Sequence, residues 1–364
     1  MTLSAGIALG DDSLRAVVSG PGGVEWTAVP AALWRSRSGG LTVGGDPAGV
    51  GAVYRDFADR VGDPVPVIGA DGIARFGADL VALTAAGLLH YATRGVAPDH
   101  LVISHPAAWS RYEISVLHSA LTTTWANGIP TSFVSGPLAV AAAATTAGAA
   151  REGDSLLTVD IGDRRTEVAL VSGGPRRVLA RSDTDDLGSV PLDRALAAHV
   201  LAQARGRFPE PDPARPAELA ALRELVERCR SARVELTRQP ATVVDVRLPA
   251  GTERVRVVRS EFDSLIYGPV SAGVAAIAQM LAEAARNDTR VAAVVLTGEA
   301  ARTPLLAELL SARIGPDSVL PPDPEWAPAR AAADIAVARA RPPRTVLSGL
   351  PRPATTPRGR ARAA

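Results

Sequence analysis

One short pattern occurs twice in this chain of 364 residues, and it constrains the fold more than any other feature. Residues 7–18 contain an apolar run, a turn that opens with Gly-Asp, and a second run with alternating apolar residues. Residues 159–170 repeat this arrangement in the second half of the chain. Each copy is typical of a β-hairpin, so the pair predicts a duplicated domain with a cleft between its halves. In proteins built in this way the two turns face each other, and their backbone N–H groups bind a phosphate chain.

Composition favours a globular α/β protein. The length and the 47% content of hydrophobic residues are sufficient for two domains with sizeable cores. The formal net charge is +1, but residues 341–364 hold six arginines and no acidic residue, so the rest of the chain is acidic. We therefore expect no nucleic acid as a partner. All 39 basic residues are arginines, and this bias is typical of a GC-rich actinobacterial genome.

The sequence predicts a cytoplasmic protein without a transmembrane segment. Cys229 is the one cysteine, which excludes an internal disulfide framework and a thiolate metal site. The N-terminus reaches Asp11 before any apolar stretch is long enough for a signal peptide. The longest apolar stretch, residues 138–150, is too short to cross a bilayer.

Hydrophobic periodicity predicts strands and helices that alternate through two domains, residues 1–150 and 151–340. In the first domain we expect strands over 3–48, 101–104 and 131–134, and helices over 80–93, 110–125 and 137–147. In the second we expect strands over 156–171, 177–182, 243–248, 255–258 and 291–297, and helices over 191–205, 218–238, 260–285, 304–314 and 325–340. Ser189 is the predicted cap of the helix 191–205. Residues 341–364 are rich in proline and arginine and are predicted to be disordered.

The order of these motifs resembles the ATPase domain of DnaK-type heat-shock chaperones over about residues 5–340. The matching segments after the first hairpin are Pro30 with 43–48, then 102–107, the helix after 136–137, 160–171, 187–193, 233–237, 259–262 and 296–304. The resemblance implies an α/β architecture, the duplicated actin-like ATPase (ribonuclease H-like) fold, with two lobes around a nucleotide-type cleft. It also implies that the peptide-binding domain of the chaperones is lacking, because the resemblance ends where that domain would begin.

Two further segments, 61–66 and 104–109, look most like the truncated proteins of this fold that are associated with type VII secretion loci in actinobacteria. This resemblance implies a protein partner, such as a component of the type VII secretion machinery.

The resemblance implies, however, that most of the parts that hydrolyse ATP have been replaced. Phosphoryl transfer to water needs Mg²⁺ on carboxylates, donors on the phosphates, a cation and a group that orients water. In the first hairpin, an aspartate and two threonines of the family are replaced by Ala8, Asp11 and Asp12. The lysine beside the cleft falls on Ala58 or Asp59.

The remaining catalytic positions show a similar pattern. The glutamate that positions water falls on Gly136. Arg60 could reach over to the position of the lysine, but an arginine is not equivalent to it. At the adenosine site Glu299 takes the place of a glycine, and the helix that contacts ribose carries Arg230, Arg233 and Thr237.

In the second hairpin Asp160 and Gly162 are kept, but Asp163, Arg164 and Arg165 replace a Gly-Gly-Thr run. Glycines in such turns allow left-handed backbone and close approach of a phosphate, which bulky side chains prevent. The two arginines have two interpretations: they bind phosphate bidentately in place of the lysine, or they are solvated or pair with Asp11, Asp12 and Asp163.

The residues placed around the cleft by the resemblance, and therefore the candidates for nucleotide binding, are Gly10, Asp11, Asp12, Asp160, Gly162, Arg164, Arg165, Gly188, Arg233, Gly298 and Arg302. Asp160 is also the candidate metal ligand, and no residue is predicted to be catalytic. His105 is interpreted as a structural polar residue, because no nucleophile motif accompanies it.

Three functions follow from these residues. The first is a degenerate pseudo-ATPase that acts as a scaffold or regulator. The second is a weak ATP-binding and ATP-hydrolysing chaperone-like ATPase, with ATP and Mg²⁺ as cofactors and Asp160 on the metal. The third is an adaptor that binds nucleic acid or a membrane surface through the arginine-rich tail.

Overall fold

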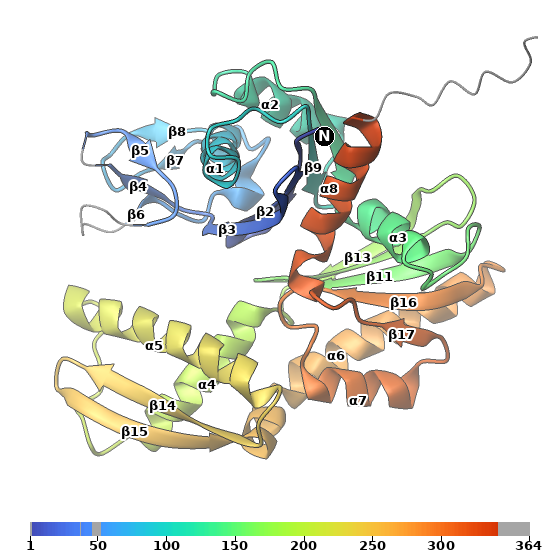
Figure 1. Ribbon diagram of the computed structural model, residues 1–364. Helices are drawn as coiled ribbons and strands as arrows, with labels where there is room; N and C mark the ends of the chain where they lie inside the picture. The colour runs from blue at the N-terminus through green and yellow to red at the C-terminus, as the bar shows by residue number, and fades with distance from the viewer. Residues whose placement is uncertain (1, 37, 46–51, 341–364) are drawn as a thin grey trace, which may run out of the picture.

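The computed structural model describes residues 2–36, 38–45 and 52–340, which form two lobes, each built on a five-stranded sheet (Figure 1). The predicted disordered tail, 341–364, lies outside the described residues, as does part of the strand region predicted over 3–48.

The sheet of lobe I has the strand order β10-β9-β1-β2-β3. Its strands are β1 (Ser4–Leu9), β2 (Ser13–Gly20), β3 (Gly23–Pro30), β9 (His100–His105) and β10 (Thr131–Ser135). The central strand β1 is antiparallel to β2 and parallel to β9. The first repeated pattern is therefore the hairpin β1–β2.

The sheet of lobe II has the order β13-β12-β11-β16-β17. Its strands are β11 (Ser155–Ile161), β12 (Thr166–Val171), β13 (Val178–Thr184), β16 (Val291–Thr297) and β17 (Asp317–Val319). The central strand β11 is antiparallel to β12 and parallel to β16, which is the pairing of β1 in lobe I. This shared topology confirms the predicted duplicated α/β architecture. The prediction missed β17, because three residues give no measurable alternation.

Helices and short strands surround the two sheets. Lobe I contains α1 (Gly77–Ala92), α2 (Arg111–Leu121), the 3₁₀ turn η1 (Ala58–Arg60), and the short strands β4 (Leu33–Arg35), β5 (Leu41–Thr42), β6 (Ala52–Tyr54), β7 (Val67–Ile68) and β8 (Ala74–Arg75). Lobe II contains α4 (Ser189–Gln203), α5 (Pro216–Leu236), α6 (Arg259–Arg286), α7 (Pro304–Arg313), and the hairpin of β14 (Ala241–Leu248) and β15 (Gly251–Val258).

One predicted helix cap is wrong. Helix α4 begins at Ser189, so Gly188 occupies the N-cap position and no side chain caps the helix. The Ser189 hydroxyl instead donates to Glu299 Oε2 over 2.9 Å. A glycine at the N-cap is favourable enough that the serine is free for this tertiary contact.

Two helices pack against the sheet of the other half of the sequence. Helix α3 (Gly136–Thr146) places Val140, Ala141 and Ala144 in a cluster with residues of β11, β12 and β16. Helix α8 (Ala327–Ala340), preceded by the 3₁₀ turn η2 (Pro324–Trp326), returns to lobe I and packs on β1 and β9. It approaches so closely that a Cβ on Gly6 would lie 2.1 Å from the backbone nitrogen of Ala333.

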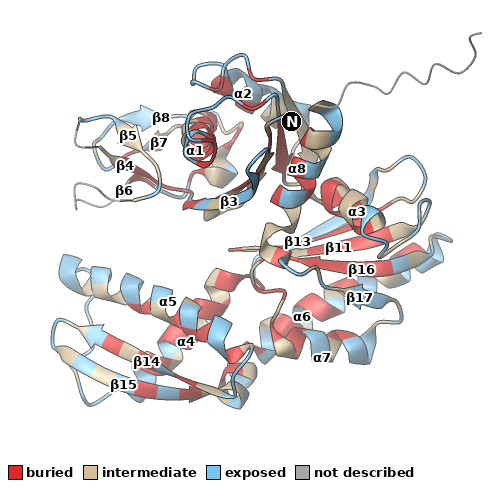
Figure 2. Ribbon diagram, in the orientation of Figure 1, coloured by how far each residue is buried: buried red, intermediate tan, exposed pale blue. Residues whose placement is uncertain are grey.

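Each lobe has its own buried core, and buried residues line the sheet faces and the inner sides of the helices (Figure 2). Within the described residues, α6 is the one helix with the length and apolar composition to cross a membrane. Its side chains Ile266, Val270 and Ile277 are buried in the core of lobe II, and 33% of its most apolar 18-residue window is buried.

Candidate functional site

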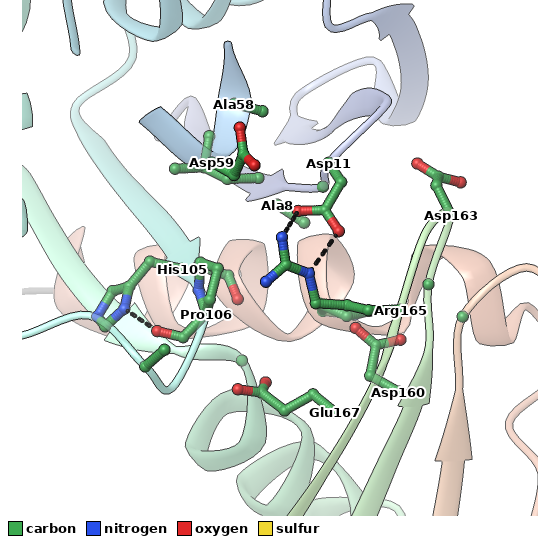
Figure 3. A pocket seen from close by; sticks show the side chains of 18 of the residues that line it. Ala8, Asp11, Ala58, Asp59, His105, Pro106, Asp160, Asp163, Arg165 and Glu167 are labelled. Atoms are coloured by element: carbon green, nitrogen blue, oxygen red, sulfur yellow. Dashed lines mark hydrogen bonds and ion pairs between the residues drawn. The ribbon is translucent and has the colours of Figure 1, made fainter. Parts of the chain in front are cut away.

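The turns of the two repeated hairpins face each other across the cleft between the lobes (Figure 3). A cavity of about 320 Å³ lies beside them and is lined by both turns and by the ends of β9 and β11. The first turn presents Asp11 and Asp12, and the second presents Arg164 and Arg165. Acidic side chains of lobe I therefore meet basic side chains of lobe II.

Arg165 and Asp11 form a bidentate ion pair across the cleft (Figure 3). The Nε atom of Arg165 lies 2.9 Å from Asp11 Oδ2, and its Nη2 atom lies 3.3 Å from Oδ1. The side chain of Asp11 is only 18% exposed. Burial raises the pKa of this carboxyl, and the neighbouring guanidinium opposes the shift.

Arg164 forms a second contact between the lobes. Its Nε atom donates to Asp12 Oδ1 over 2.6 Å, and its Nη2 atom also contacts Asp56. Asp163, the third predicted partner of the arginines, instead accepts a hydrogen bond from the Ser13 hydroxyl over 2.8 Å. We call the five residues that form these ion pairs the interlobe latch: Asp11, Asp12, Asp56, Arg164 and Arg165.

The N–H groups of the two turn glycines form hydrogen bonds within their own turns. The N–H of Gly10 donates to the Ser13 carbonyl, and the N–H of Gly162 donates to the Arg165 carbonyl, each over 3.0 Å. A Cβ on Gly10 would lie 2.6 Å from the Ser13 oxygen. These two N–H groups are therefore already used, although they stand where the resemblance implies phosphate donors.

The N-terminus of α4 is occupied in the same way. A helix N-terminus offers free N–H groups that suit an anion. Here the N–H groups of Ser189 and Val190 donate to the carbonyls of Gly162 and Asp163 over 2.9 and 2.8 Å. Gly188 permits this close docking, because a Cβ there would lie 2.7 Å from a backbone carbon of the second turn.

On the predicted adenosine side, Glu299 is surrounded by cations. Its carboxylate contacts Arg230, lies 3.7 Å from both Arg15 and Arg233, and accepts the hydrogen bond from Ser189. Burial works to raise the pKa of Glu299, but the attraction of the arginines prevails and lowers it. The carboxylate at this position is thus fully engaged by the protein.

Arg233 and Asp193 form a buried ion pair next to Glu299, with 2.6 Å between Nε and Oδ1 and each side chain 2% exposed. Burial raises the pKa of Asp193 to about 6 in spite of this partner. The predicted nucleotide contact Arg233 therefore holds α5 to α4. Thr237, also expected near ribose, donates to the carbonyl of Val234 in its own helix.

Gly298 lines the cavity, whereas Arg302 binds the segment that precedes α8. Gly298 has a φ of 93°, and a Cβ there would lie 2.2 Å from the carbonyl oxygen of Ile161. Arg302 contacts the Pro322 carbonyl and lies 3.8 Å from Asp323 and 3.9 Å from Glu325. The guanidinium thus fixes the segment that leads into α8.

Three carboxylates lie side by side across the sheet of lobe II and line the cavity. The strand registers pair Asp160 with Glu167 and Glu167 with Asp183, so the three side chains share one face. We call them the acid row. Thr297 donates to Asp160 over 3.1 Å, and the N–H of Ala107 donates to Glu167 Oε1 over 2.8 Å.

Two members of the acid row, Asp160 and Glu167, have raised pKa values. Burial raises the pKa of Asp160 to about 6 and that of Glu167 to about 7. Like charges that face each other across strands repel, and this repulsion adds to the shift of Glu167. The prediction missed this group, although Asp160 and Glu167 stand symmetrically about the predicted turn and would face each other in any hairpin that closes there.

The donor set does not fit a magnesium-bound triphosphate between the turns. Within the part of the chain that the structure describes, no three His, Cys, Asp or Glu side chains converge on one point as they would around a metal ion, and this includes the acid row. Ala8 offers no ligand, the first turn presents carboxylates, and the guanidinium groups that could face phosphate are paired with them. Asp160 as a metal ligand stays a prediction.

Other residues singled out in the sequence have structural contacts. Ala58, Asp59 and Gly136 line the cavity, as the resemblance implies. Arg60 does not reach it, because its guanidinium is held by Asp63 over 2.6 Å.

The ring of His105 is hydrogen-bonded to the Pro106 carbonyl. It is also stacked on the ring of Trp109, with 5.6 Å between the ring centroids. Cys229 is fully buried, and burial raises the pKa of its thiol to about 12.

Comparison with known proteins places these observations in a family context. The family model described as Hsp70 protein matches residues 137–338, more than half of the chain. Similar curated proteins are the chaperone protein HscA homologs of Burkholderia mallei strains SAVP1 and NCTC 10229, each 30% identical over 166 residues. That alignment covers 44% of this chain and 25% of each relative, so the chain matches only a quarter of the length of these relatives.

Proposed function

Because the chain belongs to the Hsp70 family, whose ATPase domain has the actin-like fold, we propose that it is a pseudo-ATPase of that fold in which side chains replace the nucleotide. In this proposal the interlobe latch fixes the setting of the two lobes, and the protein acts as a scaffold or regulator. The latch is the observation that carries the proposal.

The electrostatics of the latch support it. A triphosphate between the turns would meet Asp11 and Asp12, and two like charges 4 Å apart repel by about 1 to 4 kcal/mol at effective dielectrics from water to near-surface values. To bind, a nucleotide would first have to separate the carboxylates from Arg164 and Arg165. The ion pairs therefore oppose nucleotide entry in two ways.

The missing chemical groups point in the same direction. Ala8 replaces a carboxylate, Gly136 replaces the acid that would orient water, and the sequence contains no lysine. Removing one positioned group of this kind costs an enzyme about a hundredfold or more in rate. Losing several leaves little of the hydrolytic activity of the family.

A scaffold or regulator that does not hydrolyse ATP functions by binding another molecule. We infer a protein partner in the cytoplasm, and the resemblance of segments 61–66 and 104–109 to secretion-associated proteins suggests a component of type VII secretion. The matched relatives are named chaperones, which is consistent with a protein as the ligand.

A second candidate function is a weak ATP-binding, chaperone-like ATPase. It is favoured by Asp160 beside the cavity and by Gly298 at the end of β16, both of which the resemblance places at a nucleotide. In that case ATP and Mg²⁺ would be its cofactors.

Titration of ATP·Mg²⁺ separates these functions. We expect no heat of binding and no thermal shift for the wild-type chain at millimolar ATP, whereas a ligand at 100 times its Kd would stabilise by about 2.7 kcal/mol. Micromolar binding to the wild type, abolished by Asp160→Ala, would overturn the pseudo-ATPase proposal.

A set of variants tests the role of the latch directly. Replacing the turn residues by those of the family (Asp11→Thr, Asp12→Thr, Arg164→Gly and Arg165→Thr) should bring measurable ATP binding, because it removes both the repulsion and the competing ion pairs. The matched control is Arg177→Ala, an exposed arginine on the same lobe outside the cleft, which should leave the result unchanged. If the reverted turns bind no better than the wild type, the latch is not what excludes the nucleotide.

A further inference from the structure

The hairpin β14–β15 forms a two-stranded sheet of its own, separate from the two large sheets (Figure 1). Its inner face is buried through Val244, Val246, Val255 and Val257, and its outer face is exposed (Figure 2). In a sheet of two strands each strand has one edge without a strand partner. The two edges of this sheet differ in what covers them.

The hydrogen-bond pattern shows which backbone groups point to the free edge of β15. The N–H of Arg259 donates to the Pro240 carbonyl over 2.8 Å, just beyond the register that pairs Ala241 with Val258. Bonded and non-bonded pairs alternate in an antiparallel ladder. The backbone groups of Thr252, Arg254 and Arg256 therefore point away from β14.

Two contacts agree with this assignment. Val258 lies two residues beyond Arg256, so its N–H also points away from β14. This N–H donates to Glu261 Oε2 over 2.9 Å. On the other edge, the outward carbonyl of Asp245 accepts from Arg228 of α5 over 3.3 Å, so α5 covers β14. Among the described residues no hydrogen bond to the outward backbone groups of Thr252, Arg254 or Arg256 is present.

The outer face beside this edge is positively charged. Arg247 and Arg254 share Asp245, at 2.9 and 3.6 Å, and Arg254 is 76% exposed. Arg256 is exposed and forms no ion pair within the described residues. A second copy of β15 would place arginine opposite arginine in an antiparallel pairing, which like-charge repulsion disfavours.

We propose that the edge of β15 binds an extended, acidic segment of a partner protein as a third strand. Main-chain hydrogen bonds to residues 252, 254 and 256 would hold the segment, and its alternate acidic side chains would lie beside Arg254 and Arg256. This edge lies outside the cleft, so the proposal holds whether or not the chain binds nucleotide.

The test measures binding of a labelled heptapeptide that alternates glutamate with valine to the full chain by fluorescence anisotropy. We expect saturable binding that weakens about tenfold or more for Arg254→Pro, because proline removes an outward N–H without breaking the β14–β15 ladder. Arg256→Glu should weaken it to a similar degree. Arg254→Thr keeps the N–H and should cost less than the proline variant.

A peptide with lysine in place of glutamate serves as the control and should bind at least about tenfold more weakly. Circular dichroism and a thermal melt show whether each variant is folded. Hydrogen exchange of the wild type, which needs no variant, should show that the peptide slows exchange at Thr252, Arg254 and Arg256. No binding of the acidic peptide, equal binding of the lysine peptide, or unchanged exchange at these amides would overturn the proposal.

Discussion

The two ends of the cleft handle charge in opposite ways. At the hairpin end, each carboxylate of the interlobe latch has an arginine partner from the other lobe. The acid row places Asp160, Glu167 and Asp183 next to one another. Asp183 pairs with Arg181 of its own strand over 2.8 Å, whereas Asp160 and Glu167 form no ion pair within the described residues. The latch carboxylates are neutralised by pairing, whereas Asp160 and Glu167 are neutralised when they take up protons.

This difference predicts different responses to solution conditions. Paired charges at the latch should respond mainly to salt, because screening weakens the attraction between partly exposed groups. The acid row should respond mainly to pH, because Asp160 and Glu167 have pKa values of about 6 and about 7. The comparison can therefore be tested one end at a time.

The largest expected effect concerns Glu167→Gln. The pKa of Glu167 in the folded protein is about 7, above its ordinary value of 4.5, so the folded state takes up the proton more readily. Stability is therefore lost as the pH rises from about 4.5 to about 7, by up to about 3 kcal/mol for this group. Glutamine keeps an acceptor for the Ala107 N–H and carries no charge, so it should stabilise the protein at pH 8 by up to about that amount.

Urea unfolding between pH 4.5 and 8 measures this effect. The slope of unfolding free energy against pH should be less negative in the variant than in the wild type. The exposed-face variant Glu283→Gln is the control and should follow the wild-type slope. Identical slopes for Glu167→Gln and the wild type would contradict a protonated carboxyl in the acid row.

The next effect concerns Arg165→Ala at the latch. It leaves the largely buried Asp11 without its cation, and we expect a loss of about 1 to 2 kcal/mol in unfolding free energy. The exchanged pair Asp11→Arg with Arg165→Asp should recover most of that loss, whereas each single replacement should not. A double-mutant cycle by urea denaturation measures the coupling, and additive effects would show that the two residues do not interact.

The smallest effect is that of salt on Arg164. Arg164 pairs with Asp12, and the two side chains are 41% and 30% exposed. We therefore expect this ion pair to contribute about 1 kcal/mol or less to the free energy of unfolding. Raising NaCl from about 0.1 to 1 M shortens the screening length from about 10 to 3 Å and should remove most of this contribution. The salt-dependent loss should therefore be smaller in Arg164→Ala than in the wild type, and equal losses would place the salt effect elsewhere.

The repeated hairpins and most helices could be predicted because they depend on local patterns. The Gly-Asp turns and the apolar alternation around them are readable within about a dozen residues. The pairing of Arg164 and Arg165 with Asp11 and Asp12, one of two interpretations of these arginines, is present in the structure. Asp56 could not be foreseen as a partner, because a short segment between β6 and η1 brings it to the cleft.

Features that depend on packing between distant segments were harder to infer. Ser189 has the chemistry of a helix cap, but a carboxylate from another element, Glu299, competes for its hydroxyl. The acid row requires the registers of three strands, of which only the β11–β12 turn is visible in the sequence. Arg60 is close in sequence to the position of the family's lysine. Its guanidinium instead donates to Asp63, three residues further along the chain.

The close packing of α8 on β1 has a consequence for the order in which the chain can mature. Gly6 is made among the first residues and Ala333 near the end of the described chain, yet their backbones touch. During synthesis, the face of β1 that α8 covers stays exposed to solvent until almost all of lobe II has left the ribosome. Lobe I therefore cannot finish folding before lobe II has been made, and the nascent first lobe is the stage at which this protein is most exposed to aggregation or to capture by chaperones.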